Sequence, residues 1–145
     1  MTVKRVSPVE ADQLVRKGGY VYIDVRSIPE FEAGHPAGAY NIPIMHKTAA
    51  GMQPNTEFVD VVGAVFEKDA RLVLGCRSGN RSLRAAELLI QAGYEEVVDQ
   101  RAGTAGARNA FGQLEEPGWE AAGLEIGTQA HPDRAYDALR ARKES

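Results

Sequence analysis

Short apolar runs alternate along the chain with segments whose apolar residues recur at helical spacing. Such runs cover residues 20–25 (YVYIDV) and 71–74 (RLVL), and segment 95–100 (EEVVDQ) is another short candidate strand, with its two valines at the centre. Almost continuous runs of this length, rich in β-branched and aromatic residues, are typical of strands buried on both faces. We therefore expect these three segments to be strands of a sheet that is covered on both sides.

Helices are expected before and between these strands. Ser7, Pro8 and Glu10 form a capping box at the start of the first helix, and Gly18-Gly19 ends it. Four helices are predicted in this part of the chain, over residues 8–17, 27–34, 55–67 and about 82–92. Apolar residues form a buried stripe on the third, at Phe58, Val61, Val62, Val65 and Phe66. Strands that alternate with helices indicate an α/β fold with a parallel sheet.

The last of these helices has one polar stripe, at Arg84, Glu87 and Gln91, on an otherwise apolar surface. We expect this helix to be well buried. Turn residues fill segment 35–43, which we interpret as an ordered connection. The connection over 45–55 is long enough to form a wall of a binding site.

The final third of the chain shows weaker periodicity. Residues 101–118 are rich in glycine and predict a long loop before Trp119. We expect the folded domain to cover residues 1–126 and residues 127–145 to form a peripheral tail. A charged helix over 135–143 is expected within that tail, on its solvated surface.

Length and composition narrow the classes of function. A chain of 145 residues suggests one domain, and a net charge of −3 provides no broad basic field for nucleic acid or a membrane surface. No apolar run is long enough for a signal peptide or a bilayer span, so we expect a cytoplasmic protein. The three histidines lack metal-ligand spacing with the single cysteine, so we expect neither a metal nor another cofactor.

That cysteine, Cys76, follows the strand 71–74 and precedes a helix by about five residues. Ligands of parallel α/β sheets bind at the carboxyl ends of the strands. Backbone N–H groups of the loop and the positive end of the helix would favour an anion there, and hence the reactive thiolate. A buried structural cysteine and solvated arginines are the alternative. We predict Cys76 as nucleophile, with these residues binding the substrate: Arg77, Ser78, Gly79, Asn80, Arg81 and Ser82.

Two motifs in this order resemble the rhodanese-type sulfurtransferases in their single-domain form. They are YIDVRSIPEFEAGHPAGAYNIP and CRSGNRS, and the resemblance runs from about residue 7 to 126. It implies a rhodanese-like five-stranded parallel sheet with helices on both faces. It also implies that Cys76 takes sulfur from a small anionic donor such as thiosulfate, forms a persulfide, and passes the sulfur to cyanide or a thiol acceptor.

The first motif adds Asp24, Arg26 and His35 as supporting residues. Arg26 could bind the anion, but an ion pair with Asp24 that braces the loops is the preferred interpretation. His35 could be a general base, although the Gly-His segment resembles a structural turn. The family commonly has Gly-Gly after the strand 95–100, whereas this chain has Arg101-Ala102-Gly103-Thr104. Arg101 and Arg108 could add charge near the site entrance or be solvated.

Two other functions remain open at this point. Related phosphatases and arsenate reductases use a longer loop between Cys and Arg than the four residues between Cys76 and Arg81. A non-catalytic rhodanese-like module that binds a partner protein would need no thiol, so the intact Cys76 loop disfavours that function. Trp119 is interpreted as a core anchor.

Overall fold

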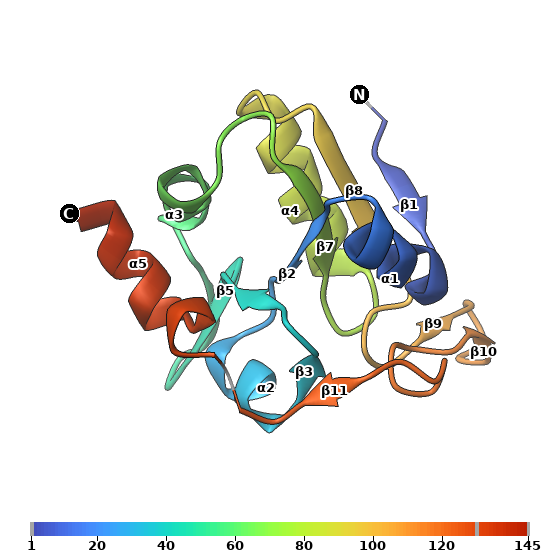
Figure 1. Ribbon diagram of the computed structural model, residues 1–145. Coiled ribbons are helices and arrows are strands. Elements are labelled where there is room, and N and C mark those ends of the chain that lie inside the picture. Colours follow the sequence, from blue (N-terminus) through green and yellow to red (C-terminus); the bar gives the residue numbers. More distant parts are fainter. Residues whose placement is uncertain (1, 130, 145) are drawn as a thin grey trace.

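A five-stranded parallel sheet forms the centre of the molecule, with helices on both sides (Figure 1). The computed structural model describes residues 2–129 and 131–144; residues 1, 130 and 145, which belong to the expected ranges 1–126 and 127–145, lie outside them. The strand order is β1-β8-β7-β2-β4. The strands are β1 (Lys4–Val6), β2 (Val21–Asp24), β4 (Tyr40–Asn41), β7 (Arg71–Gly75) and β8 (Glu96–Gln100).

The three strands predicted from apolar runs are confirmed as the central ones, β2, β7 and β8. The two edge strands have only two or three residues each, which is too short for a periodic pattern. Strand β4 lies inside the ordered connection 35–43. The five-stranded parallel sheet that the family resemblance implied is thereby confirmed.

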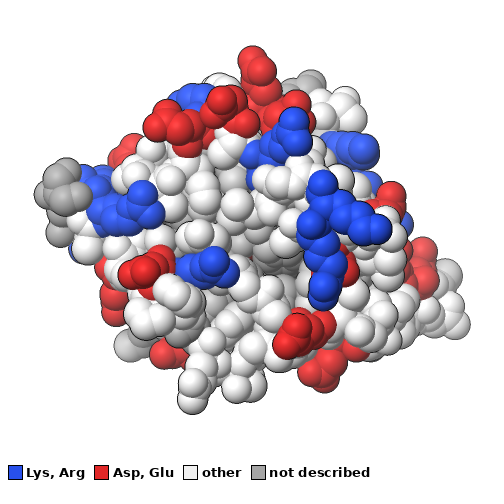
Figure 2. All heavy atoms as spheres, viewed as in Figure 1, with Lys and Arg blue, Asp and Glu red and all other residues white. Residues whose placement is uncertain are grey.

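Five α-helices occur in the described chain: α1 (Pro8–Lys17), α2 (Ile28–Ala33), α3 (Phe58–Val65), α4 (Asn80–Gln91) and α5 (Tyr136–Glu144). Helix α4 begins two residues before the predicted start because Gly79 takes the N-cap position. None of the described helices combines the length and the apolar character that crossing a membrane requires. Figure 2 shows acidic and basic side chains interspersed on one face, with neither sign forming a continuous field.

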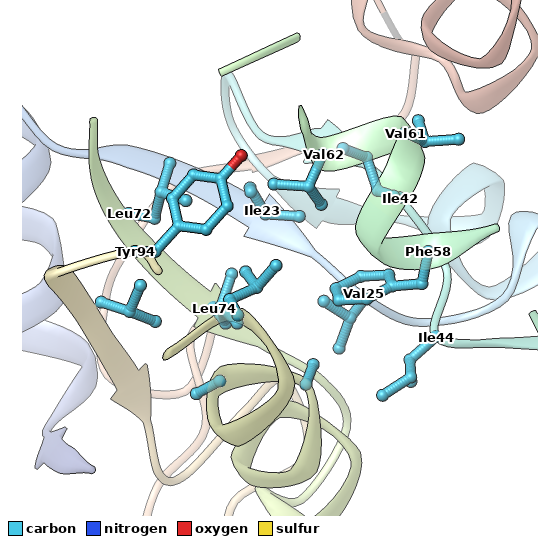
Figure 3. Packing of buried hydrophobic residues seen from close by; sticks show 14 of the residues in the cluster. Ile23, Val25, Ile42, Ile44, Phe58, Val61, Val62, Leu72, Leu74 and Tyr94 are labelled. Atoms are coloured by element: carbon cyan, nitrogen blue, oxygen red, sulfur yellow. The ribbon is translucent and has the colours of Figure 1, made fainter. Parts of the chain in front are cut away.

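Alternate residues of the strands enter two separate cores. Ile23, Leu72 and Leu74 belong to the larger core, where α3, α4 and α5 pack (Figure 3). Tyr22 and Val73 point to the opposite face and pack with α1 and α2. Burying an aliphatic side chain of this size contributes about 1.5–3 kcal/mol, so both faces stabilise the sheet.

Helices α3 and α4 each bury one face in the larger core, against the sheet. On α3, Phe58, Val61 and Val62 are buried as predicted, whereas Val65 and the following Phe66 are only half-buried. The α4 residues buried against the sheet are Ser82, Ala85, Ala86 and Leu89. The small residues at 82, 85 and 86 bring the start of α4 close to the sheet.

Three small antiparallel pairs lie outside the central sheet. Strand β3 (His35–Pro36) pairs with β11 (Ile126–Gly127), and β5 (Met45–Thr48) with β6 (Gly51–Pro54). Strands β9 (Ala107–Arg108) and β10 (Leu114–Glu116) interrupt the segment 101–118 that was expected to be a loop. A 3₁₀ helix covers Pro132–Arg134. The β3–β11 pairing ties the chain beyond residue 126 to the first motif.

The helix expected within the tail 127–145 is present as α5, and it packs in the larger core. Tyr136 and Leu139 lie three residues apart on one helical face and are buried in the larger core, next to α3. Asn55 donates a hydrogen bond from Nδ2 to the Tyr136 hydroxyl, at 3.2 Å. Arg140 pairs with Glu57, at 2.6 Å between Nε and Oε2. The charged residues of α5 concealed this narrow apolar face in the sequence.

Replacing Leu139 by Ala should lower the free energy of unfolding by about 2–5 kcal/mol, because the fully buried side chain leaves a cavity under α5. Urea denaturation monitored by circular dichroism measures this loss. Asp137→Ala is the matched control, since it truncates an exposed side chain of the same helix and should cost about 1 kcal/mol or less. Equal effects of the two substitutions would show that α5 does not belong to the core.

Candidate active site

Cys76 lies directly after β7, at the carboxyl end of the central strand, and is only 2% exposed. Its thiol is free. The loop that follows turns back over the sulfur, so that two backbone amides donate to Sγ. The nitrogen of Gly79 lies 3.1 Å from Sγ and that of Ser82 lies 3.3 Å from it. The structure therefore brings the predicted nucleophile and its predicted loop together around one sulfur atom.

The Cys76 sulfur occupies the position of a helix-capping group. The N-cap residue of α4 is Gly79, which has no side chain to accept from the first-turn amides. Sγ accepts from Ser82 in that first turn. The positive end of the α4 dipole therefore points at the sulfur, where it favours negative charge.

Gly79 is required by the backbone in two ways. Its φ of +96° lies in the left-handed region, and a Cβ there would lie 2.3 Å from the Arg101 carbonyl oxygen. The segment after β8 is therefore packed directly on the Cys76 loop. Thr104 N donates to the Cys76 carbonyl at 3.0 Å, and Ala105 N donates to that of Arg77 at 2.8 Å. The glycine-rich segment therefore lies against the loop that carries the nucleophile.

A buried polar chain behind Cys76 was missed in the sequence. Ser82 Oγ lies 3.4 Å from Cys76 Sγ and donates a short hydrogen bond to Asp99 of β8. Arg5 of β1 binds the other oxygen of Asp99, at 2.7 Å, and donates to the Gly79 carbonyl. Burial raises the pKa of Asp99, while the hydrogen bonds from Ser82 and Arg5 oppose that shift. The signal was available: Asp99 is a polar residue near the carboxyl end of a buried strand.

Arg81, which was predicted to bind substrate, is paired with a carboxylate in the structure. It forms two parallel hydrogen bonds with Glu30 of α2, at 2.7 and 2.9 Å. Ser27 donates to the same carboxylate through its hydroxyl and its backbone amide. The hydrogen bonds from Arg81 hold the pKa of Glu30 at about 2, so both side chains are ionised at neutral pH. Their opposite charges largely cancel each other.

Arg77 provides the uncompensated charge beside the sulfur. Its side chain is exposed, and within residues 2–129 and 131–144 no hydrogen-bond or ion-pair partner contacts its guanidinium. Ser78 and Asn80 are also exposed at the surface of the loop. The predicted binding residues thus divide into those that support the loop and those that face solvent.

The supporting residues of the first motif hold the neighbouring loops together. Arg26 pairs with Asp24 at 2.7 Å and donates to the Gly34 carbonyl at 2.6 Å. His35 Nδ1 lies 2.7 Å from the Phe31 carbonyl, and its ring stacks on Phe31 with 3.7 Å between centroids. These contacts match the structural interpretation of Arg26 and His35.

Trp119 is buried in the smaller core, against Tyr22 in a T-shaped arrangement with 5.2 Å between ring centroids. Its indole nitrogen donates to the Glu125 carbonyl at 2.9 Å. Trp119 therefore anchors the end of the long segment that packs on the Cys76 loop.

Two hollows open beside the loop. One, of about 370 Å³, is lined by Ser27, Glu30, Met45, Lys47, Met52, Arg77 and Arg81. The β5–β6 hairpin thus contributes side chains to this entrance, as the length of segment 45–55 suggested. The other, of about 360 Å³, is lined by Arg77, Ser78, Asn80, Ala105, Gly106 and Arg108. Among the described residues, no three His, Cys, Asp or Glu side chains are grouped so that they could hold a metal ion.

The Glu30–Arg81 pair should make folding stability depend on pH in the acid range. The pKa of Glu30 falls from 4.5 to about 2 on folding, so its contribution is complete above pH 4.5 and is lost as pH falls toward 2. Glu30→Gln should therefore destabilise the protein at pH 7, and the difference from wild type should shrink between pH 4.5 and 2. Urea unfolding at several pH values measures that difference. Glu32→Gln, at an exposed position of α2, should give no such trend; a trend shared by both variants would contradict the assignment.

Comparison with known proteins places these features in a family. A model of the family described as "Rhodanese-like domain" matches residues 7–110. The senescence-associated protein DIN1 of Raphanus sativus is 39% identical over 92 residues, which cover 63% of this chain and 50% of the relative. "Thiosulfate sulfurtransferase 16, chloroplastic" of Arabidopsis thaliana is 41% identical over 81 residues, covering 56% and 68%. The chain thus spans about half the length of the radish relative.

The fold is also that of a solved structure. The crystal structure of Rv0390 from M. tuberculosis superposes with a TM-score of 0.72 at 25% identity, covering 89% of this chain and all of that one. The family match includes both motifs, the Cys76 loop and β8. The chain therefore belongs to the rhodanese-like domain family.

Proposed function

We propose that this protein is a sulfurtransferase that carries a sulfane sulfur on Cys76. The observation that carries the proposal is the position of Sγ, which accepts two backbone N–H groups at the N-terminus of α4. A sulfur in this position can be a nucleophile and a leaving group, because the same donors stabilise negative charge in both roles.

The reaction has two steps. In the first, the Cys76 thiolate attacks the outer sulfur of thiosulfate and a new S–S bond forms. The bond between the two thiosulfate sulfurs breaks, and sulfite leaves with its electrons. In the second, cyanide or a thiol attacks the outer sulfur of the persulfide, and Cys76 leaves as a thiolate. A covalent intermediate of this kind replaces one difficult transfer by two easier ones.

The charges at the entrance support an anionic donor. Arg77 directly follows the nucleophile, and Lys47 lines the same hollow of about 370 Å³ from the β5–β6 hairpin. Both are exposed cations, and Glu30 in that hollow is already paired with Arg81. The Arabidopsis relative named a thiosulfate sulfurtransferase supports the choice of donor.

The pairing of Arg81 with Glu30 disfavours the alternative of a phosphatase, which would hydrolyse a tetrahedral oxyanion substrate. A phosphatase of related architecture needs its loop arginine to bind the tetrahedral substrate. Here Glu30 holds Arg81 through the two terminal nitrogens of its guanidinium, and the loop between Cys76 and Arg81 is short. A loop that fits closely around one sulfur leaves less room for a phosphoryl group.

Incubation with thiosulfate should add the mass of one sulfur atom to the intact protein, and cyanide should remove it as thiocyanate. Intact-protein mass spectrometry measures both steps. Cys76→Ser should gain no sulfur, because the hydroxyl is a much weaker nucleophile at neutral pH.

Folding of the Cys76→Ser variant is checked by circular dichroism, and reaction of wild-type Cys76 with an alkylating agent shows that the thiol is accessible. A folded, alkylatable protein that gains no sulfur would refute thiosulfate as donor. Phosphate release from an aryl phosphate by the same sample would instead support the phosphatase alternative.

A further inference from the structure

The hollow of about 360 Å³ beside the Cys76 loop combines positive charge with polar groups. One wall is the active-site loop, with Arg77, Ser78 and Asn80; the other is the segment with Ala105, Gly106 and Arg108. The hydrogen bond from Ala105 N to the Arg77 carbonyl connects the two walls. The hollow is therefore a built feature of the fold, adjacent to the residue that follows the nucleophile.

The arginines around the loop differ in whether a carboxylate neutralises them. Arg5 pairs with Asp99, Arg81 with Glu30, and Arg101 with Glu116. Arg77 has no partner within the described chain, and the guanidinium of Arg108 contacts only the Gly112 carbonyl there, at 2.9 Å. These two uncompensated cations line the same hollow.

Of the described residues that line this hollow, none is an Asp or a Glu. Glu115 and Glu116 line the adjoining hollow, which shares Arg108, Ser78 and Asn80, and Glu116 is already held by Arg101. A hollow lined by two arginines, with hydroxyl and amide neighbours, is complementary to carboxylates, which guanidinium groups can bind through paired hydrogen bonds.

The size of the hollow indicates what kind of ligand would bring a carboxylate to it. A volume of about 360 Å³ lies within the range of sites that bind whole organic molecules. It is much larger than a thiosulfate ion, and Lys47 lines a different hollow, which shares Arg77 with this one. An acceptor, unlike the inorganic donor, has a body to be bound while its thiol reaches the persulfide.

We propose that the hollow between Arg77 and Arg108 binds the carboxylate-bearing body of a small anionic thiol, which accepts sulfur from Cys76. This inference rests on the proposed sulfurtransferase function and assigns its acceptor class. Arg108 is the specificity-determining residue, since it belongs to the segment in which this chain departs from the common family pattern. In the transfer, the acceptor sulfur bonds to the outer persulfide sulfur, the S–S bond to Cys76 breaks, and the thiol proton passes to solvent.

Two thiols of different charge test this assignment on protein preloaded with sulfur. Mercaptosuccinate carries two carboxylates, and thioglycerol is neutral. Arg108→Ala should raise the half-saturating concentration of mercaptosuccinate about tenfold, the effect of one charge-assisted hydrogen bond, and leave that of thioglycerol unchanged. Arg108→Lys should restore part of the preference for mercaptosuccinate over thioglycerol. Arg16→Ala, an exposed substitution on α1, should change the half-saturating concentration of neither thiol.

Three outcomes would overturn the inference. These are equal effects of Arg108→Ala on both thiols, no effect on either, and an effect on the thiosulfate concentration needed for loading alone. The last would assign the hollow to the donor.

A binding measurement separates this inference from the proposed function. (Methylthio)succinate keeps the two carboxylates but cannot accept sulfur. It should slow the alkylation of unloaded Cys76 by iodoacetamide in wild type, and about tenfold more of it should be needed in Arg108→Ala. Protection that depends on Arg108 would support the anion site even if Cys76 took up no sulfur. Protection that Arg108→Ala does not weaken would refute it.

Discussion

The hydrogen bonds from the α4 amides to the Cys76 sulfur are the constraint on which the rest of the site depends. They require that a strand end and a helix start be joined by a very short loop, and that the N-cap residue have no side chain. Gly79 satisfies this requirement, and its missing Cβ lets the Arg101 carbonyl pack against the loop. The reactive atom is therefore held by backbone geometry, which side-chain motion cannot easily disturb.

Selective neutralisation of arginines sets the electrostatics around that atom. Asp99 of β8 pairs with Arg5, and Glu30 of α2 pairs with Arg81. Through these ion pairs both arginines stabilise the Cys76 loop. Arg77 and Arg108 keep their charge toward solvent. A site with the same number of arginines but different pairing would attract anions elsewhere, so the carboxylates determine where substrate charge is favoured.

Segments outside the family motifs complete the fold. Helix α5 fills the larger core beside α3, and β11 pairs with the first motif at β3. The β5–β6 hairpin and the segment 105–108 each line one of the two hollows beside the Cys76 loop. The hairpin and the segment 105–108 shape the surroundings of Cys76 without belonging to the loop that holds its sulfur.

The sequence by itself determined the central strands and the loop that follows the strand before Cys76, because each depends on local pattern: apolar runs, helix starts and turn residues. Pairing between distant residues was decided by the tertiary structure. Arg81 meets Glu30 across 51 positions of sequence and Arg5 meets Asp99 across 94, since the strand order places β1 beside β8 and α2 beside the start of α4. The burial of Tyr136 and Leu139 likewise depended on α3 being there to receive them. Local patterns record which residues are apolar or charged; only the packed chain decides which charges are neutralised by a partner and which stay exposed.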